Sequence, residues 1–236
     1  MKKNDIEYSN IDIQCIENYR FERKFLYEDQ HLDDVISTEI LLNPCLFKEI
    51  YSKRKVNNIY FDDSDFSSFK SNVAGIESRK KFRLRWYGNE LGFIRDPTFE
   101  IKKKIGLLNK KFGYSFKSFQ LDTRKLTYDQ IYNFISDRIT DRKLSLQFQL
   151  LSPSLFNSYE RSYFISACGK YRITIDDQMT FWDPRIGYSE EFCSPKLVLE
   201  LKYKPRDDDN ANIITQSFNS RLTKNSKYVL GCELIY

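Results

Sequence analysis

The ten residues from Arg79 to Gly88, RKKFRLRWYG, decide how the rest of the chain is interpreted. Successive side chains of a β-strand point to opposite faces, so one face of this strand is cationic and the other is apolar. The cations are Arg79, Lys81, Arg83 and Arg85, and the apolar residues are Phe82, Leu84 and Trp86. Four like charges in register repel one another, which indicates that a polyanion binds against this face.

The composition is that of a globular, strand-rich protein. Of the 236 residues, 41% are hydrophobic and 16% are aromatic, and aromatic side chains favour strands. The length suits one large domain, so we expect residues 1–236 to form a single domain with a loosely ordered lead-in over residues 1–18. The net charge of +5 is modest, so local clustering of cations carries the functional signal.

The cysteine and histidine content excludes several kinds of chemistry. The cysteines at positions 15, 45, 168, 193 and 232 have neither metal-site spacing nor the pattern of a disulfide framework, which predicts reduced thiols in a cytoplasmic protein. A single histidine, His31, excludes a multi-histidine metal site. The sequence contains no P-loop, because Cys168-Gly169-Lys170 lacks the upstream glycine. No stretch of 18 apolar residues occurs, so we expect no membrane span.

Alternation of charged and apolar residues recurs along the chain. It predicts strands over residues 19–27, 55–62, 98–105, 111–119, 156–166, 171–176 and 195–204. Helical spacing predicts helices over residues 29–42, 127–137 and 207–222, with a short helical turn between 64 and 75. Residues 141–151 fit helix or strand, and along 156–166 the pattern leaves open whether Glu160 or Arg161 shares the cationic side.

A Glu-x-Lys pair marks three of the predicted strands, at Glu22/Lys24, Glu100/Lys102 and Glu200/Lys202. Such charged faces could meet water while the apolar faces pack on helices, as in most alternating antiparallel strands. Alternatively, the sheet could close into a barrel with a charged interior and with amphipathic helices outside. Because the same pair recurs on three separated strands, we favour closure, and the interior would attract a polyphosphate with a divalent metal.

Taken in order, these segments resemble the VTC (polyphosphate polymerase) domain of the CYTH-like triphosphate tunnel metalloenzymes. The matching motifs are RFERKFL (20–26), IYFDDSDFSSFKSNVAG (59–75), RKKFRLRWYG (79–88), FEIKKK (99–104), YRITID (171–176), LELKYK (199–204) and SKYVLG (226–231). The resemblance implies an α+β fold: an antiparallel, closed eight-stranded β-barrel with helices outside. It also implies an enzyme that uses ATP and Mn²⁺ or Mg²⁺ to lengthen inorganic polyphosphate.

The resemblance further implies a set of site residues. The implied phosphate ligands are Lys24, Lys70, Arg83, Arg85, Lys102, Lys117, Arg161, Arg172, Lys202 and Lys227. Of these, Lys24, Arg83, Arg85, Arg161 and Arg172 would act in catalysis with Glu200. Glu200 would bind the metal, and Glu22 and Glu100 would bind the metal or position cations.

Two other functions fit the same residues. An inorganic triphosphatase or nucleoside triphosphatase would use the same tunnel with water as acceptor. A non-catalytic module that binds polyphosphate or RNA would keep the cations but would not need the carboxylate of Glu200. We expect no DNA partner, and the sequence leaves the oligomeric state open.

Overall fold

A computed structural model of the chain describes residues 19–236, apart from 91, 107, 116–117, 122–127, 140–141 and 185–190. The predicted lead-in over residues 1–18 therefore lies outside the described residues. In the described part of the chain, no helix is both long and apolar enough to cross a membrane.

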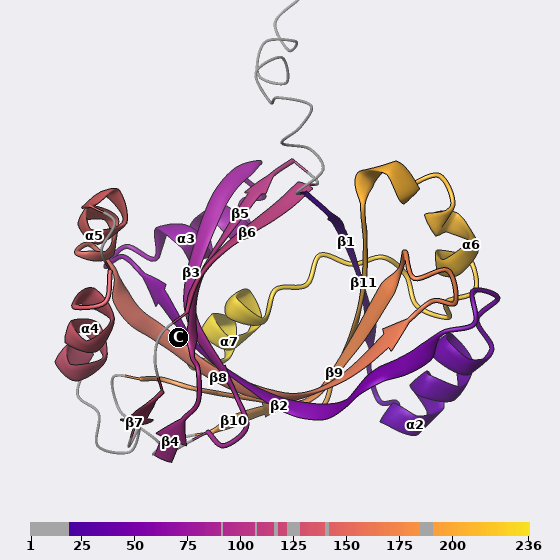
Figure 1. The fold of residues 1–236 in the computed structure, drawn as a ribbon, viewed down its shortest axis with the longest axis horizontal. Helices are drawn as coiled ribbons and strands as arrows, with labels where there is room; N and C mark the ends of the chain where they lie inside the picture. Colours follow the sequence, from indigo (N-terminus) through magenta and orange to yellow (C-terminus); the bar gives the residue numbers. More distant parts are fainter. Residues whose placement is uncertain are drawn as a thin grey trace, which may run out of the picture.

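A strongly curved antiparallel sheet dominates the structure (Figure 1). From one edge to the other its strands are β1 (Phe21–Tyr27), β11 (Leu197–Tyr203), β9 (Arg172–Trp182), β8 (Ser152–Ile165), β2 (Lys48–Asp62), β3 (Ser78–Tyr87), β5 (Thr98–Ile105) and β6 (Leu108–Ser115). The short β10 (Phe192–Ser194) pairs with β9, and β4 (Gly92–Ile94) pairs with β7 (Phe119–Leu121) in a separate two-stranded sheet. Each of the eight predicted strands, including the one over residues 79–88, has a counterpart in this large sheet with shifted ends.

The sheet does not close into the predicted barrel. Its edge strands β1 and β6 meet at a single bridge between Arg20 and Asn109, whose two backbone hydrogen bonds measure 3.3 and 3.2 Å. The expectation of a closed eight-stranded barrel is therefore corrected to a curled sheet whose edges touch once. The cause is the offset between the two edge strands. In an antiparallel ladder, the residues of β1 that follow Arg20 would have to pair with residues that precede Asn109, but β6 begins only at Leu108.

Most helices cover the convex face of the sheet, as predicted. The helices of the structure are α2 (Leu32–Val35), which continues as a π-helix over Ile36–Leu41, α3 (Ser67–Val73), α4 (Tyr128–Ser136), α5 (Arg142–Phe148), the 3₁₀ turn Pro205–Asp207, α6 (Ala211–Thr215) and α7 (Lys227–Ile235). The ambiguous segment 141–151 is thus largely helical. The predicted helix over 207–222 shrinks to α6. After α6 the backbone N–H groups of Ser217 and Phe218 bond three residues back, and that of Asn219 leaves the helix to donate to both carboxylate oxygens of Glu39.

The alternation of the strands sorts side chains between the two faces of the sheet. On the convex face, α4 and α5 contribute Ile135 and Phe148 to a cluster that contains Leu84, Trp86 and Phe99. A second cluster on the convex face is formed by strand residues together with side chains of α2, the π-helix and α6: Phe25, Val35, Ile40, Ile173, Leu199 and Ile214. Packing in these two clusters on the convex face stabilises the curvature of the sheet.

Helix α7 corrects the expectation that every helix lies outside. It lies within the arch of the sheet (Figure 1), where Tyr228 and Cys232 pack with Tyr60 on the concave side. The approach is close, since a Cβ atom at Gly231 would lie 2.5 Å from a side-chain carbon of Leu155 and 2.6 Å from one of Phe181. A glycine at position 231 therefore permits this close contact. Helix α7 forms part of the wall of the cavity on the concave side of the sheet.

Candidate functional site

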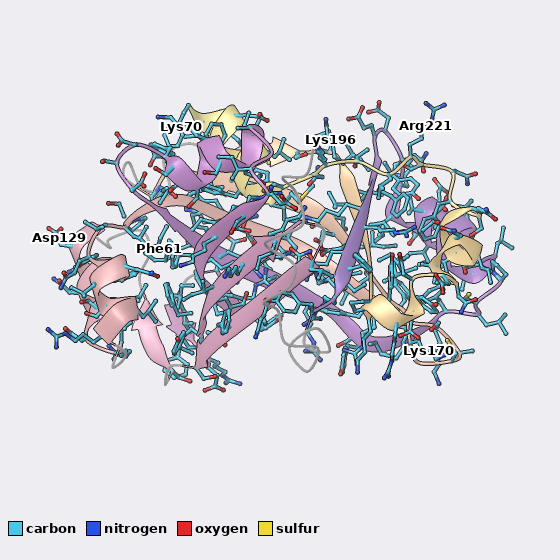
Figure 2. All side chains as sticks on the ribbon, turned by 90° about the horizontal axis from the view of Figure 1, so that it is seen from above. Phe61, Lys70, Asp129, Lys170, Lys196 and Arg221 are labelled. Carbon is cyan, nitrogen blue, oxygen red and sulfur yellow. The ribbon has the colours of Figure 1, made fainter. Side chains whose placement is uncertain are left out.

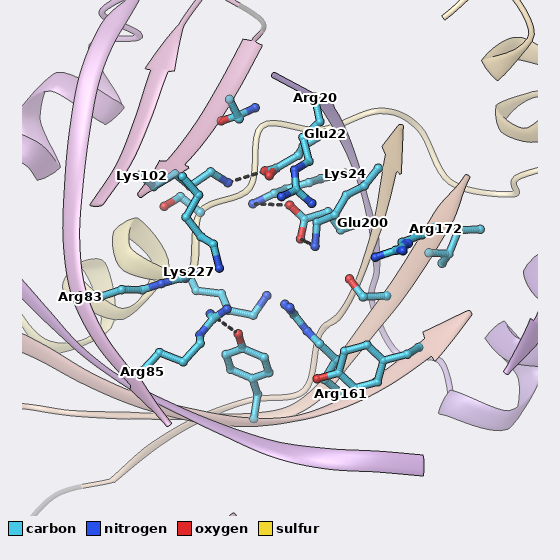
Figure 3. A pocket seen from close by; sticks show the side chains of 18 of the residues that line it. Arg20, Glu22, Lys24, Arg83, Arg85, Lys102, Arg161, Arg172, Glu200 and Lys227 are labelled. Atoms are coloured by element: carbon cyan, nitrogen blue, oxygen red, sulfur yellow. Dashed lines mark hydrogen bonds and ion pairs between the residues drawn. The ribbon is translucent and has the colours of Figure 1, made fainter. Parts of the chain in front are cut away.

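The concave side of the sheet encloses a cavity of about 330 Å³ beside α7 (Figure 3). Among the described residues, twelve cations line it: Arg20, Lys24, Lys81, Arg83, Arg85, Lys102, Lys110, Lys111, Arg161, Arg172, Lys202 and Lys227. The carboxylates that line it in the same part of the chain are Glu22 and Glu200. The charged faces of the strands therefore line a concave, partly open cavity rather than a flat solvated surface.

The structure brings most of the predicted site residues together. Each of them lines the cavity except Lys70, Lys117 and Glu100. Lys70 lies exposed on the outer side of α3 (Figure 2), Lys117 lies outside the described residues, and Glu100 is buried directly behind Arg83. On β8 the ambiguity is resolved in favour of Arg161, which lines the cavity, whereas Glu160 does not. The roles implied for these residues remain predictions.

Arg83 is held by a carboxylate beneath it. Its Nε donates to Oε2 of Glu100 at 2.7 Å, and Oε1 of Glu100 accepts from Nζ of Lys111 at 2.9 Å. Burial tends to raise the pKa of Glu100, but these cations hold that pKa far below its usual value. The charge of Glu100 is therefore committed to orienting cations, which favours the cation-positioning alternative of its prediction.

Arg85 is held by neutral groups. Its Nε donates to Oδ1 of Asn58 at 2.8 Å, and its Nη2 donates to the hydroxyl of Tyr159 at 2.9 Å. The oxygen of Glu100 that pairs with Arg83 lies 3.9 Å from Arg85 Nη1. The guanidinium is thus fixed in direction while most of its charge stays available to a ligand.

On the opposite wall, Asp176 holds two cations. Its carboxylate accepts from Arg161 Nε at 2.5 Å and Nη2 at 2.7 Å, and it pairs with Lys227 Nζ at 2.5 Å. Asp176 is fully buried, and burial tends to raise its pKa, but the two cations hold the pKa far below its usual value. Asp176 therefore orients Arg161, from β8, and Lys227, from the start of α7, toward the same space.

Glu200 reaches the cavity between two lysines. Its carboxylate oxygens lie 3.9 Å from Lys24 Nζ and 3.1 Å from Lys202 Nζ. Burial tends to raise the pKa of Glu200, but the two lysines hold it well below its usual value. Burial lowers the pKa of Lys24 to about 8, although Glu200 opposes that shift. Glu200 is thus ionised at neutral pH, whereas Lys24 loses its proton at a pH only slightly above neutral.

No group of three or more His, Cys, Asp and Glu side chains that could hold a metal occurs among the described residues. A protein usually binds Mg²⁺ or Mn²⁺ through one or two carboxylates, with phosphate oxygens and water as the other ligands. The ionised Glu200, facing the cavity, fits that arrangement. Glu22 also lines the cavity and, like Glu200, is paired with a lysine, here Lys102 (Figure 3).

Several cavity residues were not in the predicted set. Lys81 donates to the hydroxyl of Ser226 at 2.7 Å, and its pKa is lowered because it is buried among lysines. Because Lys81 belongs to the row of cations on the strand over residues 79–88, the sequence alone could have placed it in the site. Arg20 has the same strand parity as Glu22 and Lys24, so alternation could have found it as well.

The fold and site together are those of an antiparallel sheet curled around a cation-lined cavity. Residues 19–236 match the family model of the VTC domain, and the chain accordingly belongs to the VTC domain family. The predicted family is therefore confirmed. No curated protein matches the chain.

Solved structures with some likeness were found at low identity. A putative adenylate cyclase from Vibrio parahaemolyticus is 13% identical, with a TM-score of 0.49 over 89% of this chain and 97% of that one. A putative adenylyl cyclase from Hippeastrum with a dominant triphosphatase activity is 9% identical, with a TM-score of 0.47 over 92% and 96%. The capping enzyme triphosphatase of Mimivirus is 14% identical, with a TM-score of 0.36 over 89% and 91%. At these scores, none of the three assigns a function to this chain.

Proposed function

We propose that this protein is a metal-dependent polyphosphate polymerase that transfers the terminal phosphate of ATP to a growing inorganic polyphosphate chain. The observation that carries the proposal is the number of cations in the cavity, twelve among the described residues. Glu22, Glu100, Asp176 and Glu200 offset part of this charge, but the twelve cations still exceed the negative charge of one bound nucleotide. The surplus positive charge would attract a second polyanion, which is what a polymerase needs as acceptor.

The chemistry of transfer suits these residues. A terminal oxygen of the polyphosphate bonds to the γ-phosphorus of ATP, the bond from that phosphorus to the β–γ bridging oxygen breaks, and ADP leaves with that oxygen. The acceptor oxygen is already anionic at neutral pH, so no side chain has to remove a proton from it. Positioning and charge neutralisation are then the main requirements, and Arg83, Arg85 and Arg161 meet them with guanidinium groups fixed in direction.

Hydrolysis by the same cavity is the second candidate. A water nucleophile benefits from a general base whose pKa lies near the working pH. The pKa of Glu200 lies well below its usual value, which makes this carboxylate a weak base. In a triphosphatase that role would fall to Lys24, whose pKa is about 8.

Mg²⁺ or Mn²⁺ fits the site through Glu200 together with oxygens of the bound phosphates. Such a metal, when bound, would neutralise charge on the transferring phosphate. Glu200 would hold it, while Lys24 and Lys202, at 3.9 and 3.1 Å from the carboxylate, would contact the same phosphates. A non-catalytic binding module would use Glu200 only to orient Lys24 and Lys202, and the variant Glu200→Gln below separates the two roles.

The test is incubation of the purified protein with γ-labelled ATP and MnCl₂, followed by separation of polymer from orthophosphate. Long, acid-labile polymer is the expected product, and orthophosphate alone would replace the polymerase by a triphosphatase. Glu200→Gln is expected to abolish turnover while the protein still folds, because the isosteric amide loses the charge that a cation needs. Its melting temperature should fall, because Lys24 and Lys202 lose their buried counter-charge. Binding without turnover under any divalent metal would establish the non-catalytic module instead.

A matched control is Glu28→Gln, which removes a carboxylate that is 57% exposed and pairs with Lys196 at the surface. This variant is expected to keep wild-type turnover. Chelation of the metal by EDTA should stop synthesis in both the wild type and the control, and added MnCl₂ should restore it.

A further inference from the structure

Two cysteines face each other just before β2 begins and just after β8 ends. The paired residues at this end of the two strands are Lys48 and Ile165. Each step outward on one strand of an antiparallel pair matches a step outward on the other, so three steps further bring Cys45 opposite Cys168. The backbone still joins the two segments there, because the N–H of Ala167 donates to the carbonyl of Cys45 at 3.0 Å. Opposed residues have Cβ atoms about 4.5–5.5 Å apart, close to the distance of about 3.5–4.5 Å in a disulfide.

Hydrogen bonds hold both cysteines in fixed turns. The backbone N–H of Cys45 donates to Oδ1 of Asn43 at 3.1 Å. On the other side, the backbone N–H of Tyr171 donates to Oγ of Ser166 at 3.1 Å and closes the turn that carries Cys168. A bond between the two sulfurs therefore requires side-chain rotation and little movement of the backbone.

The surroundings of the two thiols suit different roles. Cys168 is exposed, and its sulfur lies 3.3 Å from Oγ of Ser166, in a turn that Lys170 marks at the periphery of the molecule (Figure 2). Hydrogen bonds from Ser166 and from the backbone N–H of Lys170, together with the charge of Lys170, lower the pKa of Cys168. Cys45 is partly buried, and burial and the nearby charge of Cys168 raise its pKa. Cys168 is thus suited to react first as a thiolate, and Cys45 to react second.

We propose that Cys45 and Cys168 form a reversible disulfide when the protein meets a hydroperoxide. The thiolate of Cys168 attacks one oxygen of the hydroperoxide, the O–O bond breaks, and an alcohol or water leaves, which makes Cys168 a sulfenic acid. The sulfur of Cys45 then attacks the sulfur of Cys168, the S–O bond breaks, and the hydroxyl group leaves as water with the proton of Cys45. The two thiols lose two electrons and two protons in total, and the hydroperoxide takes them up. A dithiol such as dithiothreitol reverses the bond by exchange.

The disulfide would tie the segment that follows the π-helix to the turn between β8 and β9. These two segments are far apart in the sequence, so the bond closes a long loop and restricts the unfolded chain. Oxidation should therefore raise the melting temperature, by about 4–16 °C for a domain of this size. The inference goes beyond the proposed function, because the reaction needs no phosphate ligand.

The test treats the purified, reduced protein briefly with hydrogen peroxide, alkylates the remaining thiols and digests the protein without reductant for mass spectrometry. A peptide pair linked through Cys45 and Cys168 is the expected product, with a loss of two free thiols per molecule. Differential scanning fluorimetry should show the rise in melting temperature, and dithiothreitol should remove both the rise and the link. Cys45→Ser should give no link and no rise, and its Cys168 should be captured as a sulfenic acid by dimedone.

The matched control is Cys193→Ser, because Cys193 is also exposed but lies on β10 opposite Thr180. Thr180 is about 25 Å along β9 from Arg172, at the end of that strand nearer Cys168. The control should form the same link as the wild type. Equal modification of Cys168 and Cys193 without a link, or a link from either cysteine of the pair to a third one, would overturn the proposal. A rise in melting temperature that persists in Cys45→Ser would also overturn it.

Discussion

Replacing Asp176 by Asn tests whether the stability of the protein depends on the buried counter-charge of Arg161 and Lys227. The change keeps the shape of the side chain but removes the negative charge that holds Arg161 and Lys227, whose side chains are 10% and 9% exposed. Two cations then remain buried without a counter-charge. Breaking a buried ion pair by removing one partner costs about 3–5 kcal/mol. For a domain of this size each kcal/mol corresponds to about 2–4 °C, so the melting temperature should fall by about 6–20 °C.

A polyanion should reverse much of that loss, because its phosphates supply the missing negative charge. Differential scanning fluorimetry with increasing tripolyphosphate measures this directly, since a ligand that binds the native state raises the melting temperature. The rise should be larger for Asp176→Asn than for the wild type. Glu28→Gln, which breaks the exposed pair with Lys196, should cost about 1 kcal/mol or less and give a wild-type response to tripolyphosphate.

Two results would refute this account of Asp176. The first is a variant as stable as the wild type without ligand, which would mean that the two cations do not depend on the carboxylate. The second is a rise with tripolyphosphate that is equal to or smaller than that of the wild type. That result would show that Arg161 and Lys227 do not meet the ligand.

Two further predictions concern pH and packing. Lys24 has a pKa of about 8 in the folded protein against an ordinary value of 10.5, so between these pH values the unfolded chain binds more protons than the folded protein. As pH rises through this window, the stability of the ligand-free protein should therefore increase, whereas its affinity for tripolyphosphate should fall. Fluorimetry and calorimetry over pH 7–10 measure the two quantities, and a change of both in the same direction would contradict the prediction. Gly231→Ala should lower the free energy of unfolding by about 1–3 kcal/mol in urea denaturation, because its Cβ would lie 2.5 Å from a carbon of Leu155, and an unchanged midpoint would mean that α7 can shift without cost.

Strand parity is the part of the site that the sequence could predict. The alternation over residues 79–88 correctly puts Lys81, Arg83 and Arg85 inside and Leu84 and Trp86 in the core. This works because a strand has only two faces, so one apolar face settles the direction of the other. The same logic did not extend to Arg161, since its neighbour is also charged.

The partners of these side chains could not be predicted in the same way. Asp176 meets Arg161 and Lys227 from strands and helices that pair only in the folded chain, so no spacing in the sequence records that contact. The position of α7 was also hidden, because residues 228–235 are apolar on most sides and define no buried face. Closure of the barrel depended on stagger between β1 and β6, which no residue pattern encodes.

The single bridge between β1 and β6 bears on how the polymer of the proposed reaction would leave. In a barrel closed by a continuous ladder, a polymer inside would have to slide out along the barrel axis. Among the described residues, the contacts across this seam include two backbone hydrogen bonds, the ion pair of Glu22 with Lys102 and the contact of Lys110 with the ring of Tyr19. Each backbone bond contributes only about 0.5–1.5 kcal/mol net. A polyphosphate bound in the cavity as proposed would therefore have a sideways route out through a weakly held seam.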